Sequence, residues 1–438
     1  MPTASLIPDL ASRRDALRRA RSLLAAHADE LIAVIESETN KPPFEALSSE
    51  ILPLLSVCGW HRKHAARVLR DRRTPGKPLW LLGVRHRVAR RPLGRVAIIA
   101  TWNYPVQLVG VQIIQAFMGG NEILVKPSER SPATQNLLLD LFGRAGIATE
   151  RIDASPEAGE AMVREADFDH LVFTGSTGVG RAIARVLAER LIPSTLELSG
   201  NDSAVVLPSA DPALAARCIW YALTLNHGQT CMAPHRVLVA EEVRDRFLEA
   251  LRAAAADAEP RKLIDEASTE RCRAVAREAV DAGGELIAGD PDADPLSAIV
   301  IADAPPGSRL HRGEHFGPLL SVRTLTDDIE PADPLTVSVF GEPSEARHFA
   351  ALSRAGTILI NDCIIPTGHP GAPLSAAGDS GWGVSRGVEG LLAMTRPTAI
   401  SSTNKKIRLP LDPPATPVAS ITPWLRRLYP LKGTKGNR

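Results

Sequence analysis

The stretch "HLVFTGSTGVGRAIARV", residues 170–186, passes from an apolar run through small residues into a helical pattern. It predicts a strand ending at Gly175 and a helix leaving from about Val179. Such a turn aims backbone N–H groups and the positive end of a helix dipole at one spot, which suits a phosphate. The glycine spacing is G-x-x-G-x-G and not the usual G-x-G-x-x-G. Two interpretations stay open: a nucleotide-binding turn carrying Gly175, Ser176 and Gly180, or a merely tight β–α turn.

Similar strand–helix pairs lie on the N-terminal side of this stretch. Apolar runs at 95–101 and 121–127 are each followed by a helical pattern. This alternation indicates βαβ units and a parallel sheet. A second α/β stretch starts near residue 203 and continues to about 362. In the N-terminal segment, helical spacing of apolar residues predicts the first helices of a folded domain, the residues being Leu17, Leu24, Leu31 and Ile35.

Composition excludes several classes of protein. The 438 residues carry a net charge of +1, so no global field would draw the chain onto nucleic acid. The five cysteines are odd in number and contain no CxxC pair, which argues against a disulfide framework or a zinc cluster. They favour a reducing compartment, and we expect a cytoplasmic protein without a bound metal. No apolar run reaches the roughly 18–20 residues of a membrane span.

Polar residues follow two of the predicted strands. Lys126 and Glu129, in "NEILVKPSE", lie where ligands bind at the C-terminal edge of a parallel sheet, and a ribose is a candidate ligand. A surface ion pair is the alternative for an isolated lysine. Glu197, in "STLELSG", ends another strand. It is either a satisfied strand-end carboxylate or a base whose pKa is raised by burial.

Cys231 follows polar residues in "NHGQTC", residues 226–231. Cys218 has the apolar neighbours expected of a structural cysteine, whereas the surroundings of Cys231 favour an accessible thiol. A thiolate is a competent nucleophile. Asn103, in "TWNYP", ends a strand, and its amide could donate to an oxyanion or simply cap the turn before Pro105. None of these residues decides the function alone.

Taken in order, these stretches resemble the aldehyde dehydrogenase superfamily, and within it the shorter, class 3-like members. The resemblance covers roughly residues 10 to 400. It is carried by seven stretches: "TWNYP", "ILVKPSE", "FTGSTGVG", "LELSG", "NHGQTC", "EHFGP" and "GDSGWG". Residues 226–231 fit the family pattern N-x-G-Q-x-C at every fixed position. Glu197 lies 34 residues before Cys231 (231 − 197 = 34), which also agrees with the family.

The resemblance implies a role for each catalytic candidate. Cys231 would attack the aldehyde carbon, and Asn103 with the backbone N–H of Cys231 would hold the oxyanion. After hydride loss a thioester would remain, and Glu197 would activate the water that hydrolyses it. The implied cofactor contacts are Lys126, Ser128, Glu129, Gly175, Ser176, Gly180, Glu314, Phe316 and Trp102. Glu129 favours NAD over NADP because it would repel a 2′-phosphate, although relatives with "KPSE" often use both.

The sequence departs from the family at two places. "ELSGNDS" has Ser199 where the family has glycine, and it lacks the proline that usually follows. An extra hydroxymethyl near Glu197 could shift its approach or supply another hydrogen bond. The segment 366–383 also replaces the family's shorter phenylalanine- and glycine-rich stretch, which lies at the substrate entrance in relatives. The aldehyde therefore cannot be named from the sequence.

Two other functions compete with hydrolytic aldehyde oxidation. An acylating relative would pass the thioester to coenzyme A, but such relatives generally lack the glutamate found at position 197. A non-catalytic nucleotide-binding relative would be expected to have lost Cys231, Asn103 or Glu197, and all three are present.

The resemblance also implies a domain plan. We expect a Rossmann-like cofactor domain at 1–200, interrupted by oligomerisation strands at 79–95, an α/β catalytic domain at 201–383, and a return to the first region at 384–401. Relatives use the strand segment to extend a sheet across a dimer, so a homodimer is expected. Residues 402–438 form a basic, proline-rich stretch that we interpret as an irregular tail. Weak membrane contact is conceivable there, where basic residues accompany the apolar residues Trp424, Leu425, Leu428 and Tyr429.

Overall fold

The computed structural model describes residues 8–78, 81, 83–256, 258–312, 315–326, 334–404 and 418–428. These residues fall into two compact units. The first comprises Met1–Leu69 with Arg91–Arg396, and the second comprises Arg70–Arg90 with Pro397–Arg438. All predicted site residues belong to the first unit.

A six-stranded sheet organises one half of the first unit, in the order β16-β7-β6-β3-β4-β5. Its strands are parallel except β16, which runs antiparallel to β7. The predicted parallel sheet is therefore confirmed. The strands are β3 (Arg95–Ile99), β4 (Glu122–Lys126), β5 (Glu150–Arg151), β6 (His170–Gly175), β7 (Ser194–Leu198) and β16 (Gly381–Trp382).

Helices cover both faces of this sheet because its strands are apolar on both sides. Ile98 and Val172 face the core beneath the N-terminal helices, whereas Ala97 and Leu171 face a second core with α7 and α8. The predicted core positions Leu17, Leu24, Leu31 and Ile35 are all buried. The helices are α1 (Leu10–Ala26), α2 (Ala28–Thr39), α3 (Pro43–Glu45), η1 (Ala46–Ile51), α4 (Leu52–Val68), α5 (Gln107–Gly119), α6 (Pro132–Ala145), α7 (Pro156–Glu165), α8 (Thr177–Arg190) and α14 (Gly387–Ala393).

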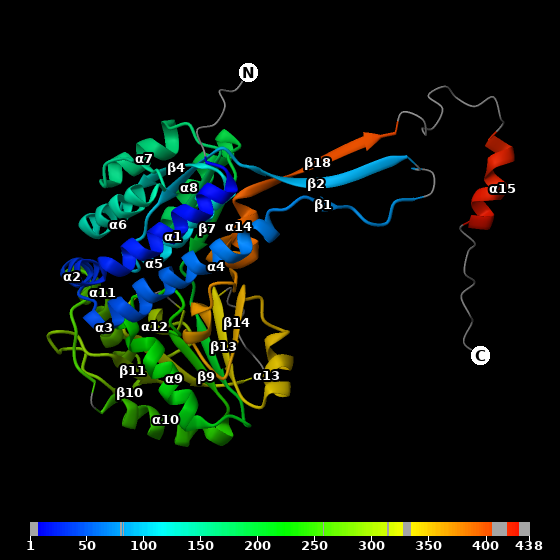
Figure 1. Ribbon diagram of the computed structural model, residues 1–438. Helices are drawn as coiled ribbons and strands as arrows, with labels where there is room; N and C mark the ends of the chain where they lie inside the picture. Colours follow the sequence, from blue (N-terminus) through cyan, green and yellow to red (C-terminus); the bar gives the residue numbers. More distant parts are fainter. Residues whose placement is uncertain are drawn as a thin grey trace, which may run out of the picture. The chain divides into compact units, whose positions relative to one another are not determined.

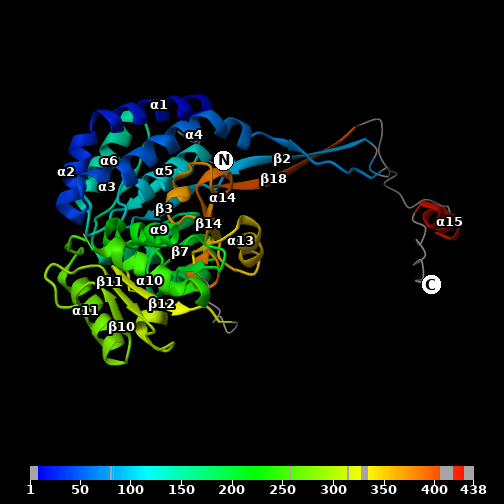
Figure 2. The same ribbon diagram turned by 90° about the horizontal axis from the view of Figure 1, so that it is seen from below.

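A seven-stranded sheet organises the other half, in the order β10-β11-β12-β9-β8-β13-β14, parallel except for β10. Figures 1 and 2 show α10, which belongs to this half, at the opposite end of the unit from α1 and α6. The strands are β8 (Ser203–Val206), β9 (Arg236–Val239), β10 (Glu285–Ala288), β11 (Ile299–Ala302), β12 (Leu319–Thr324), β13 (Thr336–Phe340) and β14 (Thr357–Ile360). The helices are α9 (Pro212–Thr224), η3 (Leu225–Gly228), α10 (Glu241–Ala255), α11 (Glu266–Asp281), α12 (Arg309–Arg312) and α13 (Pro343–Ala350).

Short elements join the two halves near the C-terminal end of the first unit. They are η4 (Ile365–Gly368), β15 (Leu374–Ser375), η5 (Gly378–Ser380) and β17 (Val384–Ser385). β15 pairs with β17, and Gly381 of β16 lies opposite Glu197 of β7. The chain has thus rejoined the six-stranded sheet by Gly381.

The second unit contains a three-stranded sheet, β1 (Arg72–Arg73), β2 (Val84–Pro92) and β18 (Thr395–Thr403), in that order. The predicted segment 79–95 contributes β2 and the first residue of β3; the partners of β2 come from elsewhere in the chain. The predicted irregular tail is wrong for part of its length, because α15 (Val418–Leu428) is a helix with Pro423 inside it. Among the described helices, none is both long and apolar enough to cross a membrane.

Candidate active site

Cys231 lies in the loop after η3 and lines two cavities. A cavity of about 530 Å³ is lined by Cys231, Glu197 and Asn103, together with the aromatic pair Trp102 and Phe316. A second cavity, of about 190 Å³, reaches Cys231 with a different set of lining residues. Cys231 is a partly exposed residue that lines both cavities. A reactant in either cavity could therefore contact the thiol.

The loop that carries Cys231 is held by its own amide side chains. Asn226 Nδ2 donates to the carbonyl oxygens of Asn103 (3.1 Å) and Gln229 (3.0 Å). Gly228 has φ +73°, and a Cβ there would lie 2.4 Å from the carbonyl carbon of Gly317. Because only glycine fits that approach, the fixed asparagine and glycine of "NHGQTC" serve to shape the loop.

The resting thiol of Cys231 is a weak acid. Burial, with the negative charges of Asp202 and Glu197, raises its pKa to about 12, and the charge of Arg386 only partly opposes this shift. Asp202 is fixed beneath the site, because Oδ1 accepts the backbone N–H groups of Leu335 (2.7 Å) and Thr336 (3.1 Å). Formation of a thiolate at neutral pH therefore requires a proton acceptor or added positive charge.

Asn103 is buried beside the Cys231 loop. Its Nδ2 donates to the carbonyl oxygen of Gln229 at 3.1 Å, and its Oδ1 accepts the Thr101 hydroxyl at 2.8 Å. The amide of Asn103 is thus fixed to the carbonyl of Gln229, which lies two residues before Cys231 in the chain. The two sequence interpretations of Asn103 are not exclusive, since an amide that donates to the loop in the free protein lies close enough to line the same cavity as Cys231.

A buried ion pair holds the backbone carbonyl of Asn103. Lys41 Nζ donates to a Glu50 carboxylate oxygen and, at 2.9 Å, to the carbonyl oxygen of Asn103. The other oxygen of Glu50 accepts the N–H groups of Val106 (3.1 Å) and Gln107 (2.8 Å) at the start of α5. Both ionic side chains are fully buried. The sequence analysis missed this pair, because nothing in the local pattern marks a lysine and a glutamate nine residues apart as partners.

Glu197 is held by two hydroxyl groups. Ser385 donates to Oε1, and Thr174 donates to Oε2 at 3.3 Å. Gln112 Nε2 in turn donates to the Thr174 hydroxyl at 2.9 Å. Burial raises the pKa of Glu197, while Ser385, Arg386 and Thr174 each act to lower it. The carboxyl group is thus a buried acid–base group with an elevated pKa, as expected of a general base.

Ser199, the departure from the family, does not supply either hydroxyl. Its backbone N–H donates to the carbonyl oxygen of Gly175 at 3.2 Å, and its hydroxyl also points to that oxygen, at 3.5 Å. Ser199 therefore joins the end of β7 to the Gly175 turn. Thr174 could have been suspected from the sequence as the last side chain before the turn, whereas Ser385 lies in a stretch without a recognisable pattern.

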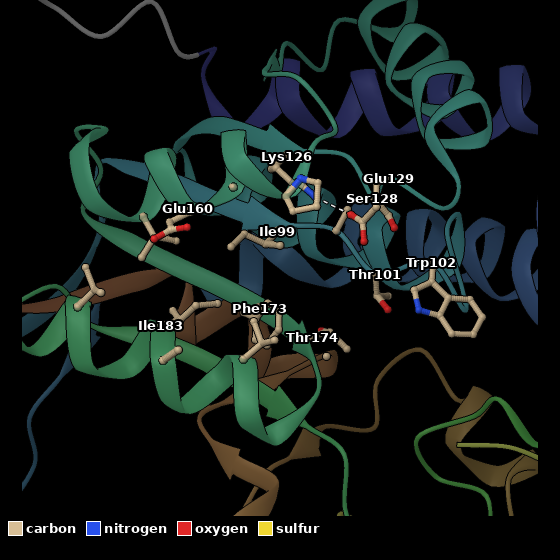
Figure 3. Close-up of a pocket in the computed structure, with 18 of the residues that line it drawn as sticks. Ile99, Thr101, Trp102, Lys126, Ser128, Glu129, Glu160, Phe173, Thr174 and Ile183 are labelled. Atoms are coloured by element: carbon tan, nitrogen blue, oxygen red, sulfur yellow. Dashed lines mark hydrogen bonds and ion pairs between the residues drawn. The ribbon is translucent and has the colours of Figure 1, made fainter. Parts of the chain in front are cut away.

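A third cavity, of about 520 Å³, lies at the C-terminal edge of the six-stranded sheet and shares wall residues with the Cys231 cavity, namely Thr101, Trp102, Glu129, Thr174, Gly175 and Val179. Figure 3 shows Lys126, Ser128 and Glu129 together on one side of it. Lys126 is almost fully buried, and its Nζ donates to Glu129 Oε2 at 2.8 Å. Burial alone would raise the pKa of Glu129, but the hydrogen bond and charge of Lys126 lower it overall.

The turn after β6 opens onto the same region. Gly175 and Ser176 line the Cys231 cavity, and Ser176 begins α8 as its N-cap, its hydroxyl accepting the N–H of Val179 at 3.4 Å. The helix starts at Thr177, two residues earlier than predicted. Gly180 lines neither cavity: a Cβ there would lie 2.3 Å from a Leu198 methyl carbon, so glycine permits α8 to pack on β7.

The aromatic candidates Trp102 and Phe316 form an edge-to-face pair with ring centroids 5.6 Å apart. Phe316 has φ +49°, an uncommon conformation for a residue with a side chain. Glu314, the remaining predicted cofactor contact, lies outside the described residues.

These residues suit a dinucleotide. The connected cavities offer a buried lysine–carboxylate pair for hydroxyl groups, a helix N-terminus at Ser176 for phosphate, and an aromatic pair at the far end near Cys231. Among the described residues, no group of three or more His, Cys, Asp or Glu is arranged to hold a metal ion.

Known proteins resemble the chain across nearly its whole length. A 4,4'-diapolycopene aldehyde oxidase from Methylomonas is 30% identical over 414 residues, covering 89% of this chain and 77% of that protein. A coniferyl aldehyde dehydrogenase from Pseudomonas is 30% identical over 410 residues, covering 87% and 84%. The crystal structure of a Mycobacterium tuberculosis aldehyde dehydrogenase complexed with NAD+ shares the fold, with a TM-score of 0.83 at 24% identity over 91% and 86% of the two chains.

The family comparison agrees with these relatives. Residues 8–400 match the aldehyde dehydrogenase family, a span that includes both large sheets and every residue of the site described above. The chain therefore belongs to the aldehyde dehydrogenase family and is an NAD(P)-dependent oxidoreductase that oxidises aldehydes.

Proposed function

We propose that Cys231 is the nucleophile of this aldehyde dehydrogenase, that Glu197 is its general base, and that Asn103 stabilises the oxyanion. The observation that carries the proposal is the shared cavity: all three side chains line one space that continues to the Lys126–Glu129 pair. A thiol placed there has an aldehyde within reach on one side and a hydride acceptor on the other.

The chemistry proceeds in two stages on Cys231. The sulfur attacks the aldehyde carbon, giving a tetrahedral thiohemiacetal whose oxyanion accepts from Asn103 Nδ2 and the backbone N–H of Cys231. The Trp102–Phe316 pair would hold a nicotinamide ring, which would accept the hydride of the thiohemiacetal, and Cys231 would then carry a thioester. Glu197 takes a proton from water, and the resulting attack on the thioester releases the carboxylic acid.

The thiol proton needs a destination before the first stage. Cys231, with its pKa raised to about 12 chiefly by burial, is a neutral thiol in the free protein. Glu197 is a buried carboxyl whose negative charge helps to keep the thiol protonated. Transfer of the thiol proton to Glu197 or to solvent, favoured by a nearby cationic nicotinamide, would give the nucleophile.

A substitution series tests the nucleophile. Cys231→Ala should lower kcat/KM by at least about a thousandfold, because the covalent route is lost. Cys218→Ala is the matched control, since Cys218 is partly buried on α9 and lines neither catalytic cavity. Formation of NADH from a panel of aldehydes is the measurement. Retained turnover in Cys231→Ala would refute the assignment, and acceleration by coenzyme A would favour an acylating enzyme.

A burst experiment tests the base. Glu197→Gln should still form NADH in a rapid first turnover and then stall, because the thioester no longer meets an activated water. Rapid mixing with mass spectrometry should detect the acylated Cys231. Steady turnover equal to wild type would remove Glu197 from the mechanism.

We further propose that NAD+ is preferred to NADP+. Glu129, with its pKa lowered overall because the pairing with Lys126 outweighs burial, is anionic at neutral pH, and a carboxylate repels a 2′-phosphate. The NAD+ complex of the M. tuberculosis neighbour supports the same choice. The proposed domain plan places this cofactor on residues 1–200 and the nucleophile on residues 201–383.

Assembly and location complete the proposal. We propose a homodimer formed through the sheet of β1, β2 and β18, whose edge strands would otherwise stay unpaired. The five free cysteines support a reducing, cytoplasmic location.

Membrane contact by the tail has one supporting feature, the 65% exposed side chain of Trp424 beside the basic residues Arg426 and Arg427. Liposome co-sedimentation of the full chain and of a chain ended after residue 404 tests it; equal pelleting would exclude the contact.

A further inference from the structure

The cavity of about 190 Å³ on the second side of Cys231 contains a single charged side chain. Among the described residues that line it are hydroxyl groups of Ser48, Tyr221 and Thr367 and apolar groups such as Ile365, but no aspartate or glutamate. The charge belongs to Arg386, whose side chain is 6% exposed. An isolated guanidinium in such a place is unusual, because a buried charge is costly without a partner.

Within the part of the chain that the structure describes, the guanidinium of Arg386 pairs directly with no carboxylate, although its charge acts to lower the pKa of Glu197 and of Cys231. Arg386 Nη1 donates to the carbonyl oxygen of Thr367 at 3.0 Å, and this is the only hydrogen bond of the guanidinium there. Nε is buried without any acceptor. No described carboxylate forms an ion pair with Arg386, and the two oxygens of Glu197 accept hydrogen bonds from Ser385 and Thr174. Nη2 is therefore the guanidinium nitrogen that has no described partner and is not fully buried, and it is left for an external acceptor.

The backbone at Arg386 is also held in an unfavourable conformation. Its φ of +62° and ψ of 164° lie in a region used almost only by glycine. The N–H of Arg386 donates to Gln115 Oε1 at 3.1 Å, which fixes the residue against α5. An arginine retained under strain, at the wall of the cavity that contains the nucleophile, is positioned for a task that the fold alone does not require.

We propose that Arg386 binds the carboxylate of the substrate, and that this chain oxidises short aldehydes carrying a carboxylate at the opposite end. The inference rests on the proposed function, because Cys231 must attack the aldehyde group. Nη2 can donate a charge-assisted hydrogen bond to a carboxylate oxygen, whereas Nε is buried and out of reach of a ligand. The cavity volume suits a chain of roughly four to six carbons, with the aldehyde at Cys231 and the carboxylate at Arg386.

Matched substrates test the proposal. For wild type, kcat/KM should be at least about tenfold higher for ω-oxo-carboxylates of four to six carbons than for neutral aldehydes of equal length. In Arg386→Gln this ratio should fall about tenfold to a hundredfold, as expected for loss of a hydrogen-bonded charge. Arg386→Lys should recover part of the ratio, because the lysine ammonium keeps the positive charge as a point charge. Arg67→Gln, at an exposed position on α4 outside the cavity, should leave the ratio unchanged.

A binding measurement separates this inference from the activity. A linear dicarboxylate of the same length lacks the aldehyde, and it should raise the melting temperature of wild type but not of Arg386→Gln. If no aldehyde is oxidised, the proposed function fails while this shift still decides the role of Arg386. If Arg386→Gln does not fold, the wild-type ratio and the Lys variant decide.

Three results would overturn the proposal. They are equal kcat/KM for charged and neutral aldehydes in wild type, an equal loss for both substrate types in Arg386→Gln, and a preference for phosphate-bearing over carboxylate-bearing aldehydes. The last result would retain an anion site but reject the carboxylate.

Discussion

At the scale of single residues, the chemistry depends on the pKa values of Glu197 and Cys231, which a few neighbouring groups set. Burial raises the pKa of both groups, because desolvation disfavours the charged form of each. Ser385 and Thr174 act in the opposite direction on Glu197, because a hydroxyl that donates to a carboxylate favours its charged form. The pKa of Glu197, the proposed base, thus reflects both a desolvated site, which raises it, and two hydrogen bonds, which lower it.

Ser385→Ala should shift the pH dependence of the hydrolytic stage upward. Burial already raises the pKa of Glu197, and removal of the Ser385 hydrogen bond removes a group that lowers it. Since the carboxylate is the active form, the rising limb of kcat against pH should move to higher pH. Stopped-flow decay of the thioester across pH is the measurement, with Ser380→Ala of the neighbouring η5 as control. A limb that stays in place, or moves lower, would contradict the hydrogen-bond argument.

Glu129→Gln should weaken the preference for NAD+ over NADP+. The substitution removes the charge that repels a 2′-phosphate, so the ratio of kcat/KM for NAD+ over NADP+ should fall, by about tenfold if one electrostatic contact dominates. Glu160→Gln, on the opposite wall of the same cavity, is the matched control. An unchanged ratio in Glu129→Gln would place the selection of cofactor elsewhere.

At the scale of elements, the site depends on the entry into α5. Glu50, on the π-helical turn η1 (Ala46–Ile51), accepts the first N–H groups of α5. Lys41 neutralises Glu50 and holds the carbonyl of Asn103, and its ammonium lies 3.9 Å from the Tyr104 ring centroid. One buried ion pair therefore ties three segments of backbone to the oxyanion side of Cys231.

Lys41→Met should destabilise the fold and misplace Asn103. Removing one partner of a fully buried pair leaves Glu50 uncompensated, which costs about 3–5 kcal/mol. Denaturant unfolding gives the free energy, and Lys63→Met, exposed on α4, is the control. The double variant Lys41→Met with Glu50→Gln should recover part of the loss. A change in free energy of unfolding below about 1 kcal/mol would show that the pair is not structurally important.

At the scale of the whole molecule, the proposed dimer depends on the second unit. The nine-residue strand β18 forms one edge of its three-stranded sheet. An edge of that length offers unpaired backbone groups to another chain.

Light scattering at micromolar concentration should give the mass of two chains, about twice 46.9 kDa. A chain ended after residue 404 keeps β18 and should stay a dimer, because the tail beyond it contributes no strand among the described residues. A mass of one chain for the full protein would reject the dimer, and a monomeric truncated chain would assign dimerisation to the tail.

Much of the fold and the candidate site follows from the sequence alone. Strand–helix alternation around Gly175 specified a parallel sheet, because apolar runs followed by amphipathic helices can bury both faces only in that arrangement. The positions of Cys231, Glu197 and Asn103 at strand ends and in a glycine-shaped loop were also visible, since the C-terminal edges of parallel strands meet in space. The helix within the tail was not visible, because proline at 423 argues against one.

Only the tertiary structure decided which distant groups surround those residues. The hydroxyl of Ser385, the buried pair of Lys41 and Glu50, and the strained Arg386 reach the site from segments whose local patterns give no sign of it. The physical reason is that local sequence fixes periodicity and turns over a few residues, whereas desolvation, charge pairing and cavity shape depend on which segments pack together. Periodicity thus determined the class of fold, and the motif around Cys231 indicated the proposed nucleophile. Packing determined the charge of the site and the shape of the cavity next to it.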